Sequence, residues 1–276
     1  MGFGIKSHIK GYRQYQYLRD SSIHQKLVTG ASPYFMYIGW LGHQNIGDEA
    51  LFECFREELF SRSIILPYYD LSLTSIIGRI TRRSAVLLGG GTLINDDNYL
   101  FPLERSQRRG RMTFVFGTGV GDLTFWSRHT ANQPQRGNQK RWIAALKQAE
   151  YVGVRGPRSL SWLESNGITN AEIIGDPALM LKSSKRNSAA NERVIGLNLG
   201  SHDPIDGDAE KLLHSIKIFC HHAIKRGYKI EYLSMSPIDH SIGKILASEF
   251  QSNNFSIKPF SNSTTALMNQ ISTCDV

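Results

Sequence analysis

The sequence predicts an α/β protein built from two Rossmann-like domains of parallel sheet. Short apolar runs alternate with amphipathic stretches, several runs end in glycine-rich turns, and the alternation restarts after a polar segment. Strands that alternate with helices imply parallel pairing through right-handed crossovers. The 276 residues, 41% of them hydrophobic and 20% charged, suffice for two folded domains of medium size.

The first domain is expected to span residues 31–182, after a basic, tyrosine-rich extension at residues 1–30. Short apolar runs predict strands at 34–40, 63–66, 84–88, 113–116, 151–154 and 171–174. Periodic apolar residues predict helices at 48–60, 139–149 and 156–165, with a loop at 122–139. Cys54 falls on the apolar stripe of the first of these helices, so we expect it to be buried as a small hydrophobic residue.

The second domain is expected at residues 194–276, after a charged linker at 183–193 that is rich in serine and asparagine. Its predicted strands are 194–199, 229–235 and 256–258, and its predicted helices are 209–226, 241–251 and 264–272. Cys220 lies on an apolar stripe and is expected to be buried. The last residues stand where another strand should begin. The second domain is therefore predicted to be incomplete and the chain to be a truncated form of a longer protein.

The formal net charge of +8 is compatible with three classes of anionic partner: a nucleic acid, an anionic membrane surface or anionic substrates. No basic element interleaved with aromatic residues is visible, so we predict no nucleic-acid partner. Most arginines of the clusters at 79–83 and 105–111 are expected on a solvated face. No apolar run reaches the roughly 18 residues of a membrane span, and no signal-peptide core is visible. We therefore expect a cytoplasmic protein, with the inner face of the membrane as an alternative place of peripheral contact.

Three glycine-rich turns each follow a predicted buried strand: residues 39–48 (GWLGHQNIGD), 89–96 (GGGTLIND) and 117–122 (GTGVGD). Glycine lets the backbone approach a ligand closely, and the N-terminus of a following helix attracts anions. None of the turns matches the dinucleotide or P-loop fingerprints. One such turn alone is explained by a tight strand-to-helix connection, whereas three in succession indicate a site for an anionic, phosphorylated ligand.

Five motifs in order resemble those of the polysaccharide pyruvyl transferase family. They are residues 42–51 (GHQNIGDEAL), 89–94 (GGGTLI), 116–122 (FGTGVGD, followed by Phe125 and Trp126), 154–159 (VRGPRS) and 175–179 (GDPAL). The resemblance implies a two-domain fold of the B-type glycosyltransferase kind. It also implies transfer of a pyruvyl group from phosphoenolpyruvate to a sugar diol, as a ketal, in the synthesis of exopolysaccharide or cell-envelope polysaccharide. The implied partners are phosphoenolpyruvate as donor substrate and a sugar or lipid-linked oligosaccharide as acceptor, with no cofactor.

Arg155 occupies the family's arginine position just after a predicted strand, and it is the expected clamp for the donor anion; an ordinary surface arginine is the alternative. Asn45 and Asp48 serve either as helix caps or as ligand contacts. Asp176, before Pro177, is expected to be structural. The donor-binding residues implied together are Asn45, Gly47, Asp48, Gly89, Gly90, Gly91, Thr92, Gly117, Gly119 and Arg155.

In the family, an Arg-Leu-His segment is implied to follow the Asp-Val pair that here ends the chain, and to supply the proton donor. His43 is the histidine best placed to substitute, although a loop histidine bonded to backbone is the alternative. His214, His221 and His222 share a predicted helix without a carboxylate at ligand spacing, so we predict no metal. Two other functions stay open: a B-type glycosyltransferase that uses a nucleotide sugar, and a non-catalytic remnant that binds an anionic ligand or a partner.

Overall fold

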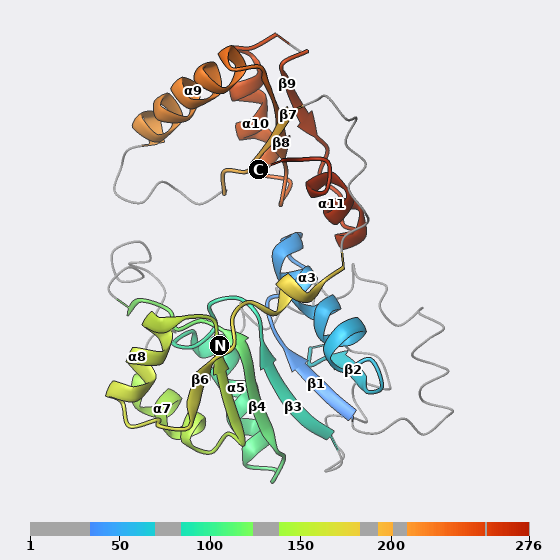
Figure 1. The fold of residues 1–276 in the computed structure, drawn as a ribbon. Helices are drawn as coiled ribbons and strands as arrows, with labels where there is room; N and C mark the ends of the chain where they lie inside the picture. Colours follow the sequence, from blue (N-terminus) through green and yellow to red (C-terminus); the bar gives the residue numbers. More distant parts are fainter. Residues whose placement is uncertain are drawn as a thin grey trace. The chain divides into compact units, whose positions relative to one another are not determined.

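The computed structural model describes residues 34–69, 84–123, 138–182, 193–200, 209–251 and 253–275 (Figure 1). These residues form two parallel sheets flanked by helices, which confirms the predicted α/β class. The expected extension at residues 1–30, Arg79, Arg82 and Arg83, and all but the last residue of the expected linker lie outside the described residues.

The first sheet is parallel throughout, in the strand order β2-β1-β3-β4-β5-β6. The predicted strands are confirmed to within two residues at either end. The side chains of the central strands β1 and β3 and of the edge strand β2 are almost all buried, as expected for a parallel sheet covered on both faces. The bounds are β1 Tyr34–Ile38, β2 Ile64–Pro67, β3 Ser84–Gly89, β4 Thr113–Thr118, β5 Tyr151–Val154 and β6 Ala171–Ile173.

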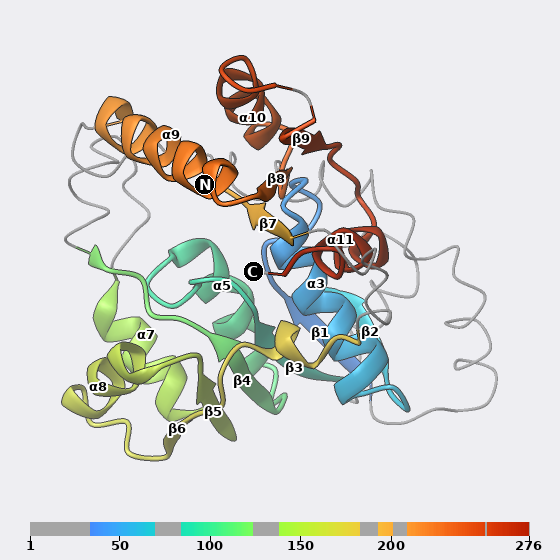
Figure 2. The ribbon, with the colours of Figure 1, turned by 45° about the horizontal axis from the view of Figure 1, so that its top comes forward.

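Helices α7 (Gln139–Lys147) and α8 (Pro157–Ser165) lie together at the end of this sheet that carries β5 and β6 (Figures 1 and 2). The helix predicted at 48–60 begins two residues earlier, as α3 (Ile46–Cys54), and its last turn is the π-helix η2 (Phe55–Leu59). It begins earlier because the Asn45 side chain accepts a hydrogen bond from the Gly47 amide at 3.1 Å and so caps the first turn. Cys54 is buried, as predicted.

Helix α5 (Asp97–Gln107) was not predicted, because Pro102 and a run of charged residues interrupt its apolar pattern. It begins at Asp96, whose carboxylate accepts from the Asn98 amide at 3.1 Å, and it buries Leu100 and Leu103. Most arginines of the cluster at 105–111 were expected on a solvated face: Arg105 and Arg108 are exposed, Arg109 is half-buried, and Arg111 is the exception at 5% exposed.

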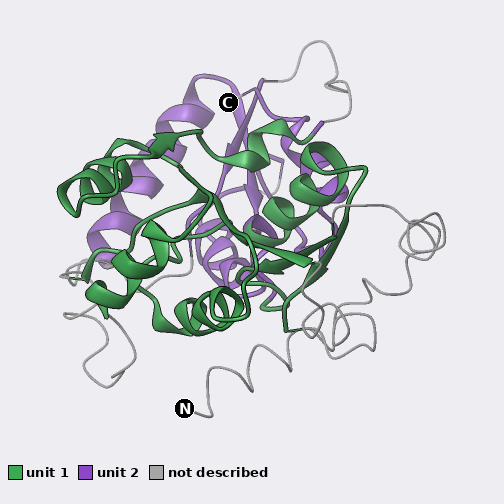
Figure 3. Cartoon of the chain, turned by 90° about the horizontal axis from the view of Figure 1, so that it is seen from below, with its two compact units in different colours: residues 1–43, 48–181 green, residues 44–47, 182–276 purple. Residues whose placement is uncertain are grey.

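The chain divides into two compact units, residues 1–43 with 48–181 and residues 44–47 with 182–276 (Figure 3). The second unit holds the parallel sheet β7-β8-β9 and its own core around Cys220, Ile230, Tyr232 and Leu246. Its elements are β7 Arg193–Leu197, α9 Ala209–Lys225, β8 Tyr228–Leu233, α10 Asp239–Ala247, β9 Phe255–Lys258 and α11 Thr264–Ile271. Helix α10 begins two residues before the predicted start and ends four residues before the predicted end.

After α11 the chain returns to β7. The Asp275 amide donates to the Val194 carbonyl, and the Asp275 carboxylate accepts from the Val194 amide, both at 2.7 Å. The amide and carbonyl of one strand residue point to the same side, so Asp275 lies on the side of β7 away from β8. No helix in the described part of the chain combines the length and the apolar character needed to cross a bilayer.

Candidate functional site at the carboxyl edge of the first sheet

The strands that follow β1 in the chain lie on opposite sides of it in the first sheet. Strand β2 pairs with one side of β1, and β3, which follows β2 in the chain, pairs with the other side. In an open parallel sheet such a switch point is where ligands bind, beyond the carboxyl ends of the strands. The first and second glycine turns follow β1 and β3, so both lie at this point.

The second and third glycine turns are joined to each other through backbone hydrogen bonds. The Gly119 amide donates to the Gly91 carbonyl at 3.0 Å, and the Ile94 amide donates to the Gly119 carbonyl at 3.2 Å. The Thr118 hydroxyl accepts from the Leu93 amide at 3.2 Å. These bonds fix the two turns as one layer of backbone at the edge of the sheet.

Packing within the protein already requires several of these glycines. A Cβ atom on Gly89 would lie 2.8 Å from the Phe55 ring, and one on Gly117 would lie 2.2 Å from Cγ of Pro177. One on Gly90 would lie 2.9 Å from Leu51, and one on Gly91 would lie 3.1 Å from Oδ1 of Asp48. The glycines therefore allow protein side chains to approach, and their donor-binding role stays a prediction.

The helices that follow the turns present fewer open amides than the sequence indicates. Asn45 caps α3 through the Gly47 amide, which confirms the capping interpretation of Asn45. Asp96 caps α5 through the Asn98 amide. Because side chains occupy these N–H groups, an anion at this edge depends on a cationic side chain more than on the helix ends.

Arg155 follows β5 and is held by one edge of its guanidinium group. Its Nε donates to the Gly117 carbonyl at 3.1 Å and lies 3.4 Å from Oδ2 of Asp176. The other oxygen of Asp176 accepts from the Ala178 amide at 3.0 Å and caps the 3₁₀-helix η3 (Pro177–Met180), so Asp176 is structural as predicted.

The Arg155 side chain is 32% exposed, and its Nη atoms make no hydrogen bond to any residue that the structure describes. An arginine fixed at Nε with both Nη groups available can bind a carboxylate or phosphate through two parallel hydrogen bonds.

Asp48, in the first turn of α3, is a titratable group of this edge. Burial raises the pKa of its carboxyl group to about 7; the positive charge of Arg155 opposes the shift and the negative charge of Asp176 adds to it. A carboxyl group with a pKa near neutrality can both hold and release a proton at physiological pH. Asp48 therefore offers acid–base chemistry beside the cation.

Three side chains that the sequence did not single out shape this edge. The Glu49 carboxylate, buried, accepts from the Gly42 amide at 2.7 Å and fixes the first turn. The Tyr37 hydroxyl donates to the Gly89 carbonyl at 2.8 Å, and the Ser159 hydroxyl accepts from the Val120 amide at 3.1 Å. Glu49 and Ser159 lie within two of the quoted motifs, and this position was the only sequence feature that pointed to them. Tyr37 could not be distinguished from any other residue of its predicted strand.

His43 does not resemble a proton donor in its surroundings. Its ring stacks on Trp40, with centroids 3.6 Å apart and planes at 9°. Burial lowers the pKa of His43, which disfavours the charged ring that would act as a proton donor. The structure thus brings Arg155, Asp48, Gly91 and Gly117 to one edge. Thr92 there is exposed, and the donor-binding roles of Asn45 and Gly47, which fall in the other compact unit, stay predictions.

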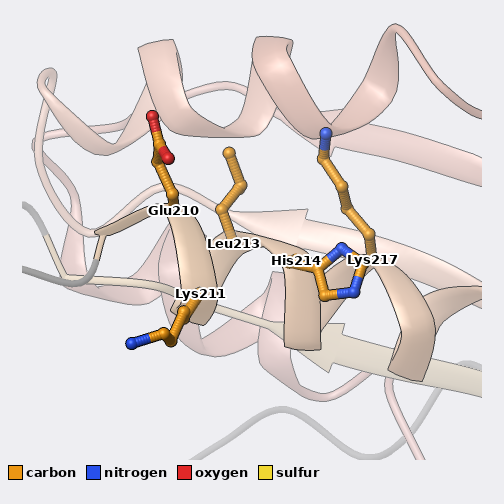
Figure 4. A pocket seen from close by; sticks show the side chains of 5 residues that line it. All are labelled: Glu210, Lys211, Leu213, His214 and Lys217. Atoms are coloured by element: carbon orange, nitrogen blue, oxygen red, sulfur yellow. The ribbon is translucent and has the colours of Figure 1, made fainter.

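Two further features of the described residues bear on binding. No three histidine, cysteine, aspartate or glutamate residues among them lie close enough together to hold a metal ion. A separate hollow on α9 contains none of the predicted site residues (Figure 4). It is lined by Glu210, Lys211, Leu213, His214 and Lys217.

The fold and the site define the class of protein: it is a Rossmann-like α/β protein with polar groups at the carboxyl edge of its larger sheet. The family model of polysaccharide pyruvyl transferase matches residues 45–276, and the chain belongs to this family, whose members are transferases. A comparison with curated proteins finds no match.

Among solved structures, the crystal structure of TarM is similar at a TM-score of 0.39 and 9% identity. The match covers 70% of this chain and 35% of the TarM chain. This chain therefore spans about a third of the length of TarM, and a likeness this distant has no bearing on function.

Proposed function

We propose that the protein transfers the pyruvyl group of phosphoenolpyruvate to a sugar diol, giving a cyclic ketal and phosphate. Family membership supports a transferase; the donor and the acceptor class are the proposal. The observation that carries it is the pairing of Arg155, fixed at Nε with open Nη groups, with Asp48, whose carboxyl pKa is about 7. The proposed setting is exopolysaccharide or cell-envelope synthesis on the cytoplasmic side, without a cofactor.

Arg155 binds the donor. Its two Nη groups match the two oxygens of a carboxylate or phosphate, and the bonds of Nε to Gly117 and Asp176 keep the guanidinium plane in place before the ligand arrives. The joined second and third turns supply backbone dipoles near the anion as charge develops on the leaving phosphate.

Asp48 moves the proton. In its protonated form it delivers a proton to the methylene carbon of the donor, which leaves an oxocarbenium-like centre at the neighbouring carbon. One acceptor hydroxyl oxygen bonds to that carbon, the bond to the phosphate oxygen breaks, and the second hydroxyl closes the ketal. Of the two hydroxyl protons released, one restores Asp48 and the other leaves with phosphate.

The test is donor binding and phosphate release by Arg155→Ala. Removing a charge-assisted bidentate contact should weaken binding of phosphoenolpyruvate roughly ten- to hundredfold, measured by titration calorimetry. The control is Arg158→Ala, which removes an exposed arginine in the first turn of α8 and should leave the affinity unchanged.

Equal affinity of wild type and Arg155→Ala would remove Arg155 from the donor site. Donor binding without phosphate release in the presence of any sugar-lipid acceptor would instead favour a non-catalytic binding protein. Release of a nucleotide from a nucleotide sugar would favour the glycosyltransferase alternative.

A further inference from the structure

Helix α9, the long helix of the second unit, packs against its sheet by one side only (Figure 1). Cys220 and Ala223 are buried in the core of the unit, with Leu213, Ile216 and Ile224 partly buried against it. At 3.6 residues per turn these side chains share one face of the helix. The opposite face, along roughly 25 Å of helix, is exposed.

This exposed face carries large apolar side chains. Leu212 is 52% exposed, and Ile218 and Phe219 are each 46% exposed. Leu212 and Phe219 lie two turns apart in one row along the helix, and Ile218 lies about 100° further around the same exposed half. Surface residues of this size that gather on one element mark an interaction site more often than residues that are scattered singly.

Cations lie in the same two rows as these apolar side chains. Lys225 lies two turns after Ile218, and Arg226 lies two turns after Phe219. The polar side chains of Lys211, Ser215 and His222 lie between the rows, and all of these residues are exposed. We call the following residues together the outer face of α9. It consists of Leu212, Ile218, Phe219, His222, Lys225 and Arg226.

The one acidic residue of α9 lies away from its outer face. Glu210 projects to the same side as Leu213 and Lys217, and Lys217 forms an ion pair with Glu249 (Figure 4). Because the acid lies on that flank, the outer face combines apolar side chains with positive charge alone. This is the composition of helices that lie in the interface of an anionic bilayer.

We propose that the outer face of α9 docks the protein on an anionic phospholipid surface. The apolar side chains enter the headgroup region, and Lys225 and Arg226 extend their charged ends to lipid phosphates along the same surface. A second copy of the chain is a poorer occupant, because two such faces would place cations against cations. A nucleic acid would leave the exposed apolar side chains without a partner. The proposal depends on α9 alone and does not need the proposed reaction.

The test is sedimentation of the full chain with vesicles of phosphatidylcholine, with and without phosphatidylglycerol. We expect binding to the mixed vesicles, weak binding to phosphatidylcholine alone, and weaker binding at high salt. The variant Ile218→Ser with Lys225→Gln should bind the mixed vesicles roughly tenfold less tightly. The matched control is Ile245→Ser with Lys244→Gln, the same chemical change at exposed positions of α10, which should bind like wild type.

A second readout does not depend on loss of binding. Tryptophan emission of Phe219→Trp should shift to the blue on addition of mixed vesicles and should be quenched by brominated lipid, because the ring enters the interface. Equal binding by the test and control variants, equal binding to both vesicle types, or an unshifted emission would each overturn the proposal. A wild-type dimer that Ile218→Ser dissociates would show that the face joins two copies instead.

Discussion

Asp48 connects the stability of the first unit to its proposed chemistry. Its carboxyl pKa is about 7 in the folded chain, against an ordinary value of 3.8, because burial disfavours the charged form. The folded state therefore binds this proton more tightly than the unfolded state. The contribution of Asp48 to the free energy of unfolding therefore falls as the pH rises from about 4 to about 7, and it stays low above pH 7.

Asp48→Asn should consequently stabilise the protein at pH 8 and have little effect at pH 4. We expect a gain of about 2 kcal/mol in the free energy of unfolding at pH 8, roughly half the figure for a fully buried carboxyl group, because Asp48 is partly exposed. Urea unfolding at both pH values measures the gain. The control is Glu164→Gln, which changes an exposed carboxylate of α8.

The same variant should lose phosphate release by a factor of about 100 or more, since general acid catalysis contributes about that much. His43→Gln should keep most of the activity, because burial of the stacked ring disfavours its charged form. A more stable Asp48→Asn that retains full turnover would confirm the titration and contradict the role in proton transfer.

At the scale of elements, Gly117 fixes the distance between β4 and η3. Its φ is +71°, and a Cβ atom would lie 2.2 Å from Pro177. Cys54 on α3 also reaches η3, where its thiol donates to the Pro177 carbonyl at 2.8 Å. The short helix η3 is thus the point at which β4, α3 and, through Asp176, Arg155 are joined.

Gly117→Ala should destabilise the protein by about 3 kcal/mol, from backbone strain together with the clash against the proline ring. Gly175→Ala is the matched control. Its φ is +81°, but a Cβ atom there has no neighbour within 4 Å, so strain alone should cost about 1 kcal/mol. Thermal unfolding of the two variants measures the difference. An equal loss of stability in both would show that the contact with Pro177 does not contribute to the effect of Gly117→Ala.

The strands of both sheets could be predicted because each is a short apolar run between turns. Helix α5 could not be predicted, because Pro102 and several charged residues interrupt its apolar pattern. Its apolar face is recognised only from the burial of Leu100 and Leu103 in the structure. The π-helix η2 does not change the apolar periodicity that continues from α3, so the sequence pattern does not predict it.

The candidate site was partly predictable for a similar reason. Arg155 stands directly after a strand and in a motif, both of which are local signals. The contacts of Arg155 with Gly117 and Asp176, and the burial that shifts the pKa of Asp48, join residues 21 or more positions apart in the chain. Such contacts depend on the tertiary structure, which local pattern does not encode.

At the scale of the whole molecule, the two units have separate cores. Leu246 is fully buried in the second core and does not belong to the first. Leu246→Ala should cost about 2–5 kcal/mol within the second unit. Hydrogen exchange should accelerate in β8 and β9, while the amides of β3 and β4 keep wild-type protection. Equal acceleration in both sheets would mean that the units unfold together.

The contact between Asp275 and Val194 has a consequence for solubility. In the described part of the chain, β7 would otherwise present unpaired amides and carbonyls on the side away from β8, where a strand of a neighbouring molecule could add. Asp275 occupies the amide and carbonyl of Val194 and places a negative charge beside them. A foreign strand would have to displace that carboxylate before it could pair with Val194, so Asp275 opposes the addition of a strand at this position of the edge.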